Sequence, residues 1–116
     1  MPRFVVLTHD HPILHWDLLL EAGETLQSWR LSTPPKLGQA IVATTLPPHR
    51  LHYLDYEGPI SGDRGTVSCW DRGEFVADLW TAEELRLRLV GQHFSATAHL
   101  RFVAGVWTAE FFEPSP

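Results

Sequence analysis

The stretch RFVVLTHDHPILHWDLLLEAGETLQSWRL, residues 3–31, decides the fold because it contains three strand signals in succession. Residues 3–8 are rich in β-branched and aromatic side chains, residues 15–21 follow a break that contains Pro12, and residues 25–31 follow the segment AGE. Short apolar runs bounded by turn residues predict strands, and AGE predicts a hairpin connection. The chain is therefore predicted to begin as a series of short strands.

Strand signals continue to the C-terminus. Pro47 and Pro48 are expected to end the strand before them, and residues 71–75 to form a tight turn that leads to a further strand. Thr81 and Glu84 have the spacing of a helical capping box, which predicts one helical turn. Besides the first three strands, we expect strands at 40–45, 51–58, 66–70, 85–90, 94–103 and 106–113, the last two joined by Ala104-Gly105.

Many short strands with few helical signals predict a mainly β fold, either a barrel or a sandwich. Closure into a barrel would hide the strand edges, which otherwise attract other chains. With 116 residues, the chain is long enough to bury a core without disulfides. This length predicts one domain over residues 1–116.

Composition and charge exclude several classes of protein. The single cysteine, Cys69, excludes an internal disulfide framework and fits a reducing compartment. No apolar run approaches the roughly 20 residues of a membrane span, and the N-terminal one is too short for a signal peptide, so we expect a cytoplasmic protein without a membrane partner. The net charge of −5 argues against coating nucleic acid by bulk electrostatics, although Arg50, Arg64 and Arg72 are close enough in sequence for a local basic patch.

The segment HDHPILHWD, residues 9–17, concentrates histidine and aspartate. On a strand, side chains two residues apart point to the same face, so His15 and Asp17 are predicted to project together. An imidazole and a carboxylate suit Mn²⁺, Zn²⁺ or Fe²⁺, and either His9 or His11 could fold back to supply a third ligand. Such a site leaves coordination positions open for substrate. The alternative interpretation is a solvated strand face or a simple His–Asp hydrogen bond.

A second polar cluster, PPHRLHY, occupies residues 47–53. His49 follows a Pro-Pro loop at the start of a predicted strand, where a general acid or a hydrogen-bond donor to a transition state could stand, and Tyr53 lies four residues further on. The alternative is a polar rim beside a tyrosine of the core. His93 and His99 have no acidic or cysteine neighbours in the sequence, and we interpret both as structural or surface groups.

Together, the two clusters resemble the pattern of a known family. Its segments occur here in family order as RFVVLTH, LHWDLLLE, LQSW, HRLHYLDYEGPI and GTVSCWDRGEF, which cover most of residues 3–75. On these segments the chain resembles the 3′-phosphoesterase module that occurs at the N-terminus of bacterial DNA ligase D and as small stand-alone proteins. The resemblance implies an eight-stranded barrel, so we expect a closed or nearly closed β-barrel of about eight strands with one or two short helical turns.

The resemblance also implies an activity in DNA repair and its metal. Members of this family use a Mn²⁺ site to remove 3′-phosphates and terminal ribonucleosides from DNA ends, which leaves a 3′-hydroxyl for sealing. The metal-binding positions of the family fall on His9, His15 and Asp17. This choice leaves Asp10 and His11 without a role. Mn²⁺ is therefore the expected cofactor, with Zn²⁺ as the alternative.

The resemblance places phosphate recognition in the second cluster. The histidine and tyrosine that contact the scissile phosphate in the family correspond to His49 and Tyr53, and we expect Arg50 and Arg72 to bind the substrate as well. An imidazole and a phenol beside a divalent cation can stabilise a transferring phosphoryl group. The predicted site therefore combines a metal with two side-chain donors.

The chain departs from the family pattern at its phosphate-binding cations. The family has an arginine two residues after the metal-binding aspartate, where this chain has Leu19, and two further basic positions fall on Thr33 and near Ile41. Leucine cannot supply the paired hydrogen bonds of an arginine. We therefore predict preserved metal binding with weak, altered or absent end processing. The cations that could substitute from other positions are Arg30, Lys36, Arg50 and Arg72.

Three functions follow from these observations. The first is a metal-dependent phosphoesterase that acts on DNA 3′ ends and works with a DNA ligase or polymerase. The second is a catalytically impaired module that keeps the metal for structure or for docking DNA or a repair partner, which Leu19 and the acidic net charge favour. The third is a metalloenzyme for a different small phosphorylated substrate. In each case we expect a monomer.

Overall fold

Residues 1–114 are described by the computed structural model, and residues 115–116, the end of the predicted single domain, lie outside the described part. Most of the described chain is extended. The elements are β1 (Arg3–His9), β2 (His15–Ala22), β3 (Thr25–Leu31), β4 (Ala40–Arg50), the 3-10 helix η1 (Leu51–Leu54), β5 (Gly58–Pro59), β6 (Thr66–Trp80), β7 (Glu84–Gly91), β8 (Ser95–Val103) and β9 (Val106–Phe112).

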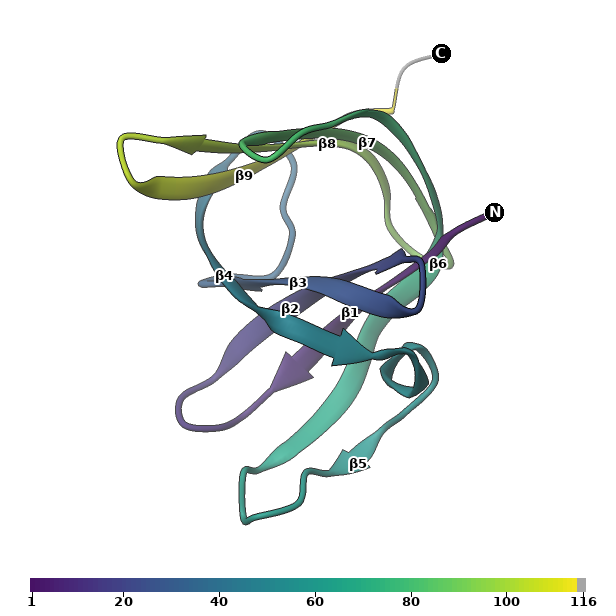
Figure 1. The fold of residues 1–116 in the computed structure, drawn as a ribbon, viewed down its shortest axis with the longest axis vertical. Coiled ribbons are helices and arrows are strands. Elements are labelled where there is room, and N and C mark those ends of the chain that lie inside the picture. Colours follow the sequence, from purple (N-terminus) through teal and green to yellow (C-terminus); the bar gives the residue numbers. More distant parts are fainter. Residues whose placement is uncertain (115–116) are drawn as a thin grey trace.

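The strands close into an antiparallel barrel (Figure 1). Their hydrogen-bonded order is β1-β2-β3-β4-β9-β8-β7-β6, and β6 pairs back with β1. The short strand β5 pairs only with the beginning of β6. This closure confirms the predicted barrel of about eight strands, and η1 is its single helical turn within residues 1–114. No helix in that range is long and apolar enough to cross a membrane.

The first strands are apolar on both faces because both faces are covered. Alternate side chains such as Phe4, Val6 and Leu18 point into the barrel and join a core to which all eight barrel strands contribute. The side chains between them point outward and form a second apolar group, here called the outer cluster: Val5, Leu7, Leu19, Leu26, Leu54 and Val67. Residues 51–60 cover this cluster. Each fully buried aliphatic side chain contributes about 1.5–3 kcal/mol, so both layers fix β1 and β2.

Residues 51–58 do not form the predicted strand, and that prediction was wrong. The helix η1 occupies Leu51–Leu54 instead. In a 3-10 helix, side chains three residues apart lie on the same side. Leu54 accordingly belongs to the outer cluster, and Leu51 packs against it from the same side of the helix. Apolar side chains recur in this segment every three residues as well as every two. The outer cluster beneath the segment favours the spacing of three, which is that of a 3-10 helix.

The tight turn predicted at residues 71–75 was also wrong, because β6 runs unbroken through it. Asp71 is buried, and its carboxylate accepts the backbone N–H groups of residues 92–94, which connect β7 to β8. A Cβ atom at Gly73 would lie 2.0 Å from the carbonyl oxygen of Val90. The glycine therefore lets β7 approach closely, at the point where its pairing with β6 begins.

Thr81 stabilises a hairpin turn and not the predicted helical turn. Its Oγ1 accepts the backbone N–H groups of Glu83 and Glu84 at 3.3 and 3.0 Å, as in a capping box. The chain nevertheless enters β7 at Glu84 and pairs with β6. The capping hydrogen bonds are thus present, but the residues after them form a strand because they pair with β6.

The predicted C-terminal hairpin is confirmed. β8 and β9 are joined by Ala104 and Gly105, whose φ angles are 52° and 81°. Positive φ at both central residues is required in the type I′ turn of a two-residue hairpin. The predicted hairpin between β2 and β3 is present as well.

β4 continues past Pro47 and Pro48, which were expected to end it. The two prolines lie where the pairing register shifts between Leu26 and Ser28 of β3. Proline has no N–H to donate and is tolerated at such irregularities. Because β4 continues through the two prolines, His49 lies opposite Leu26 of β3, on the outer face of the barrel.

Candidate active site

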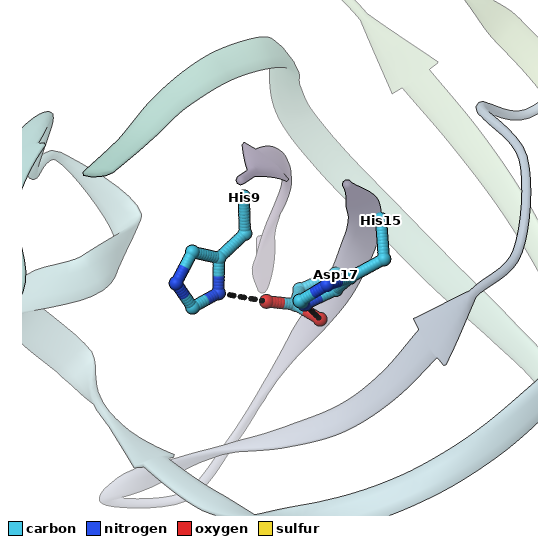
Figure 2. A group of neighbouring side chains, drawn as sticks. All are labelled: His9, His15 and Asp17. Carbon is cyan, nitrogen blue, oxygen red and sulfur yellow. Dashed lines mark ion pairs between the residues drawn. The ribbon is translucent and has the colours of Figure 1, made fainter. Parts of the chain in front are cut away.

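His9, His15 and Asp17 come together on the outer face of the barrel (Figure 2). His9 is the last residue of β1 and His15 the first of β2, and the two are direct cross-strand partners. Asp17 follows two residues along β2 on the same face as His15. One nitrogen of each imidazole and one carboxylate oxygen lie within 4.8 Å of one another. Alternation along β2 places His15 and Asp17 together, and the pairing of β1 with β2 brings His9 next to them.

Hydrogen bonds to backbone carbonyls fix the tautomer of both imidazoles. His15 Nδ1 lies 2.9 Å from the carbonyl oxygen of Ile13, and His9 Nε2 lies 2.9 Å from that of Arg64. A carbonyl oxygen only accepts, so each of these nitrogens carries the proton of the neutral ring and donates it. The opposite nitrogens, Nε2 of His15 and Nδ1 of His9, face Asp17 and are lone pairs when the rings are neutral.

Asp17 presents its carboxylate to these two lone pairs. Its Oδ1 lies 3.1 Å from His15 Nε2, and its Oδ2 lies 3.5 Å from His9 Nδ1. The side chains of His15 and Asp17 are only 3% and 5% exposed, and that of His9 is 17% exposed. His15 Nε2 and Asp17 Oδ1 are buried without a hydrogen-bond partner. Acceptors that converge out of contact with water repel one another unless a cation lies between them.

This donor set fits a divalent metal ion. Two imidazole nitrogens and one carboxylate oxygen suit Mn²⁺, Zn²⁺ and Fe²⁺ alike, and three protein ligands leave positions open. The bonds from the far side of each imidazole to a carbonyl are the support that metal-binding histidines usually have. His11, the other residue considered as a third ligand, lies outside this group, with its ring centroid 6.5 Å from that of His9.

His49 and Tyr53 form the second part of the site. His49 lies near the end of β4 and Tyr53 in η1, and their ring centroids are 5.6 Å apart with the rings edge to face. His49 Nδ1 lies 2.8 Å from Ser28 Oγ and 3.0 Å from the carbonyl oxygen of Pro47. The Ser28 hydroxyl donates to the carbonyl of Leu26 at 3.1 Å and so accepts from Nδ1. Nε2 is therefore the nitrogen of His49 that remains for a ligand.

Both clusters open into one cleft of about 500 Å³. The predicted site residues that line it are His9, Asp17, His49, Arg50 and Tyr53. Arg72 does not line it, because its guanidinium lies beside the outer cluster with Nη2 3.6 Å from the Glu57 carboxylate. It also neighbours Cys69, whose thiol pKa is raised by burial. The structure thus brings three of the four predicted phosphate-binding side chains, His49, Arg50 and Tyr53, into one cleft with His9 and Asp17.

The cleft contains three arginines that form no ion pair with a carboxylate of residues 1–114. Arg30, Arg50 and Arg64 line it, and none of them forms an ion pair within residues 1–114. The arginines that are paired with carboxylates lie outside the cleft: Arg3, Arg72, Arg86 and Arg88. Although the net charge of the chain is −5, the wall of the cleft has an excess of positive charge, which attracts anions.

None of the three positions that correspond to family cations, at Leu19, Thr33 and near Ile41, lines this cleft. Leu19 is fully buried in the outer cluster, and Ile41 is buried in the barrel core. Thr33 is half-buried, and its hydroxyl donates to the carbonyl of Pro34 at 3.2 Å. None of these positions supplies a charge that could bind phosphate. The arginines that line the cleft are therefore the cations available for it.

Asp10, expected to have no role, holds the turn that bonds His9. Its Oδ1 accepts the backbone N–H of Thr66 at 2.8 Å, which ties the end of β1 to the turn that contains Arg64 and Gly65. A Cβ atom on Gly65 would lie 2.2 Å from this same oxygen. The Arg64 carbonyl, held in this turn, in turn binds His9. Turn residues at 61–65 indicated the turn, but nothing in the sequence indicated what it packs against.

Ser28 was missed, although alternation contains a signal for it. In LQSWR, Ser28 and Arg30 flank Trp29, whose side chain packs in the barrel core. Polar residues on either side of a buried tryptophan belong to the opposite face. The strand register places Ser28 opposite Leu19 and Arg30 opposite Asp17. Without that register, the sequence does not show that Ser28 and Arg30 share the outer face with His15 and Asp17.

Two comparisons with known proteins indicate the same protein family. A family model for the DNA ligase D 3′-phosphoesterase domain matches residues 7–101. The chain is 34% identical over 111 residues to the multifunctional non-homologous end joining protein LigD of Pseudomonas aeruginosa. That alignment covers 90% of this chain and 13% of the relative, so the chain spans only a small part of the relative's length.

Proposed function

The chain belongs to the DNA ligase D 3′-phosphoesterase domain family, and on this basis we propose that it is a metal-dependent phosphoesterase. Its substrate is a 3′-terminal phosphate or ribonucleoside at a DNA end, and its cofactor is Mn²⁺. The product is a 3′-hydroxyl that a DNA ligase or polymerase can use, and the protein acts as a monomer. The observation that carries the proposal is the convergence of one imidazole nitrogen each from His9 and His15 on the Asp17 carboxylate, beside the cleft that also holds His49.

The metal would be held by His9, His15 and Asp17. When bound, a divalent cation offsets negative charge on the phosphate while the ester bond breaks. The chain contributes orientation, because each imidazole is fixed by a carbonyl on its far side. It also excludes water, since His15 and Asp17 are almost fully buried.

His49 and Tyr53 act on the phosphate from the other side of the cleft. Ser28 and the Pro47 carbonyl hold His49 Nδ1, so a protonated Nε2 can donate to a phosphate oxygen. Water attacks phosphorus, the bond between phosphorus and the 3′ oxygen breaks, and this proton passes to the departing 3′ oxygen, so that a 3′-phosphate end yields a 3′-hydroxyl and inorganic phosphate. The Tyr53 hydroxyl supplies a second donor. Leu19 supplies none, so we propose a lower rate than that of a family member with arginine at this position.

End processing tests this proposal. Two 5′-labelled primer–templates, one with a 3′-phosphate and one with a 3′-terminal ribonucleotide, are incubated with the protein and Mn²⁺. We expect both labels to move to the mobility of the 3′-hydroxyl product, and EDTA to stop the reaction. His15→Ala should abolish it, whereas His93→Ala, at an exposed histidine outside the cleft, should have no effect. If neither end is processed with Mn²⁺, Zn²⁺ or Mg²⁺ by protein that binds the metal, the proposal fails.

A second candidate is a metal-binding module that docks DNA without turnover. The burial of Leu19 favours it, because position 19 presents no phosphate-binding cation to the cleft. This candidate predicts that Mn²⁺ raises the free energy of unfolding and that DNA binds without product. A mobility-shift assay run beside the phosphate-release assay separates the two functions, and a mononucleoside 3′-phosphate in the same assay tests for a smaller substrate.

A further inference from the structure

Arg30 lies beside the metal-binding group. It is the direct cross-strand partner of Asp17, so its side chain leaves the barrel on the same outer face. Arg30 also lines a second pocket of about 190 Å³, which includes His15 and the exposed Ile13. The arginine thus forms part of the wall between two hollows, next to two of the three metal-binding residues.

The guanidinium of Arg30 is held in place without being neutralised. The residue is half-buried, and its Nε is buried without a hydrogen-bond acceptor. No carboxylate of residues 1–114 forms an ion pair with it, although Asp17 is its neighbour across the strands. A buried N–H without a partner is unfavourable and rare. Arg30 is thus an unpaired cation on the cleft wall, and its partly exposed guanidinium can take an acceptor from the cleft.

The other two arginines of the cleft are less suited to bind an anion. Nε and Nη2 of Arg64 donate to the carbonyl and hydroxyl oxygens of Ser61 at 2.7 and 3.2 Å. Arg50 is exposed, and water and salt screen an exposed charge. Of the three cleft arginines, Arg30 combines partial burial with the absence of an ion pair or a hydrogen bond to Ser61, so we consider it the best placed to bind an anion.

We propose that Arg30 is the phosphate-binding arginine of this chain and that its guanidinium holds non-bridging oxygens of the 3′-terminal phosphate. This inference rests on the proposed function and names the residue that replaces the arginine absent at Leu19. The two positions are close: Leu19 pairs with Ser28, and Arg30 is the next residue of β3 on the same face. A guanidinium matches a phosphate with two parallel N–H···O bonds. The phosphate then lies between His49 and the pair His9 and Asp17, all of which line the same cleft.

Charge and shape variants test this role. Arg30→Met removes the charge and keeps much of the volume, Arg30→Lys keeps the charge without the paired donors, and Arg101→Met removes an exposed arginine outside the cleft. For each variant, KM and kcat are measured on the 3′-phosphate primer–template. The dissociation constant of inorganic phosphate is measured by calorimetry on the Mn²⁺-loaded protein, and Mn²⁺ binding by electron paramagnetic resonance.

We expect Arg30→Met to raise both KM and the dissociation constant of inorganic phosphate by about tenfold or more. Arg30→Lys should recover only part of this loss, and Arg101→Met should match the wild type. Mn²⁺ affinity should be unchanged throughout. Folded Arg30→Met with wild-type KM and wild-type phosphate affinity would overturn the inference. If Arg30→Met does not fold, Arg30→Gln and Arg30→Lys provide the same comparison.

Failure of this inference is distinct from failure of the proposed function. A wild-type chain that processes DNA ends and is unaffected by substitution of Arg30 contradicts the phosphate-binding role alone. A wild-type chain that binds inorganic phosphate through Arg30 but processes no DNA end contradicts the phosphoesterase and supports the anion site. A Mn²⁺-loaded chain that does not bind inorganic phosphate overturns the role of Arg30.

Discussion

Nε2 of His15 lies 3.1 Å from Oδ1 of Asp17, and both atoms are buried without a hydrogen-bond partner. Because Nδ1 of His15 donates to the carbonyl of Ile13, the neutral ring has no proton to offer the carboxylate. Two acceptors therefore face each other where water does not screen their repulsion. With a neutral imidazole this arrangement is unfavourable, and it becomes favourable when a proton or a metal cation lies between the two atoms.

Asp17→Asn should stabilise the metal-free protein and abolish its stabilisation by Mn²⁺. The amide Nδ2 can donate to the lone pair of His15, and satisfying a buried acceptor contributes about 1–3 kcal/mol. Urea unfolding at pH 8, in EDTA and in Mn²⁺, measures both effects. The wild type should gain about 2.7 kcal/mol at a Mn²⁺ concentration of 100 times Kd. A metal-free Asp17→Asn protein that is less stable than the wild type would show that the carboxylate is already satisfied.

Gly65→Ala should weaken Mn²⁺ binding. A Cβ there would lie 2.2 Å from Asp10 Oδ1, so the turn must shift and take with it the Arg64 carbonyl that orients His9. Loss of such support lowers metal affinity by about 10- to 100-fold. Gly23→Ala is the matched control, since Gly23 also has positive φ but has nothing within 4 Å of its Cβ position. Equal Mn²⁺ affinities in the two folded variants would exclude a positioning role for this turn.

Ser28→Ala should lower kcat without changing Mn²⁺ affinity. The hydroxyl bonds His49 Nδ1 at 2.8 Å, and without it only the Pro47 carbonyl holds the ring. We expect kcat to fall by about tenfold, a part of what general acid–base catalysis contributes. Ser95→Ala, at an exposed serine of β8, serves as the control. A wild-type kcat for Ser28→Ala would mean that His49 needs no such orientation.

Glu84→Gln should destabilise the protein at neutral pH but not in acid. A hydrogen bond from His99 holds the pKa of the Glu84 carboxyl below its usual value, and Arg86 adds to the effect. Stability from a lowered carboxyl pKa is present above the unfolded-state pKa and is lost as pH falls through the folded-state pKa. The unfolding free energies of wild type and variant should therefore converge in that acid range. A difference that persists at lower pH would contradict the pairing with His99.

The strand periodicities of the sequence predict most of the barrel. Alternation in residues 15–21 places His15 and Asp17 on one face, and the turn residues at Ala104 and Gly105 define the last hairpin. These features depend on near neighbours in the chain, so a local pattern contains them. They also predict the type of chemistry that the outer face supports.

The features that the sequence did not predict depend on distant contacts. Residues 51–58 fit a strand or a 3-10 helix, and only the outer cluster beneath them selects the helix. Asp71 resembles a turn residue, but its partners lie about twenty residues away, at 92–94. The position of Arg30 beside Asp17 follows from strand register alone. Register is set by the whole barrel, and a single segment does not encode it.

A Mn²⁺ titration that records metal binding and phosphate release in the same samples tests the metal-dependent phosphoesterase most directly. Binding is followed by electron paramagnetic resonance, and release is followed from a 3′-phosphorylated primer–template. We expect the rate of release to rise in proportion to occupancy of the site at His9, His15 and Asp17, with both signals lost in His15→Ala and kept in His93→Ala. Release that persists in EDTA, or a filled site without release, would contradict it.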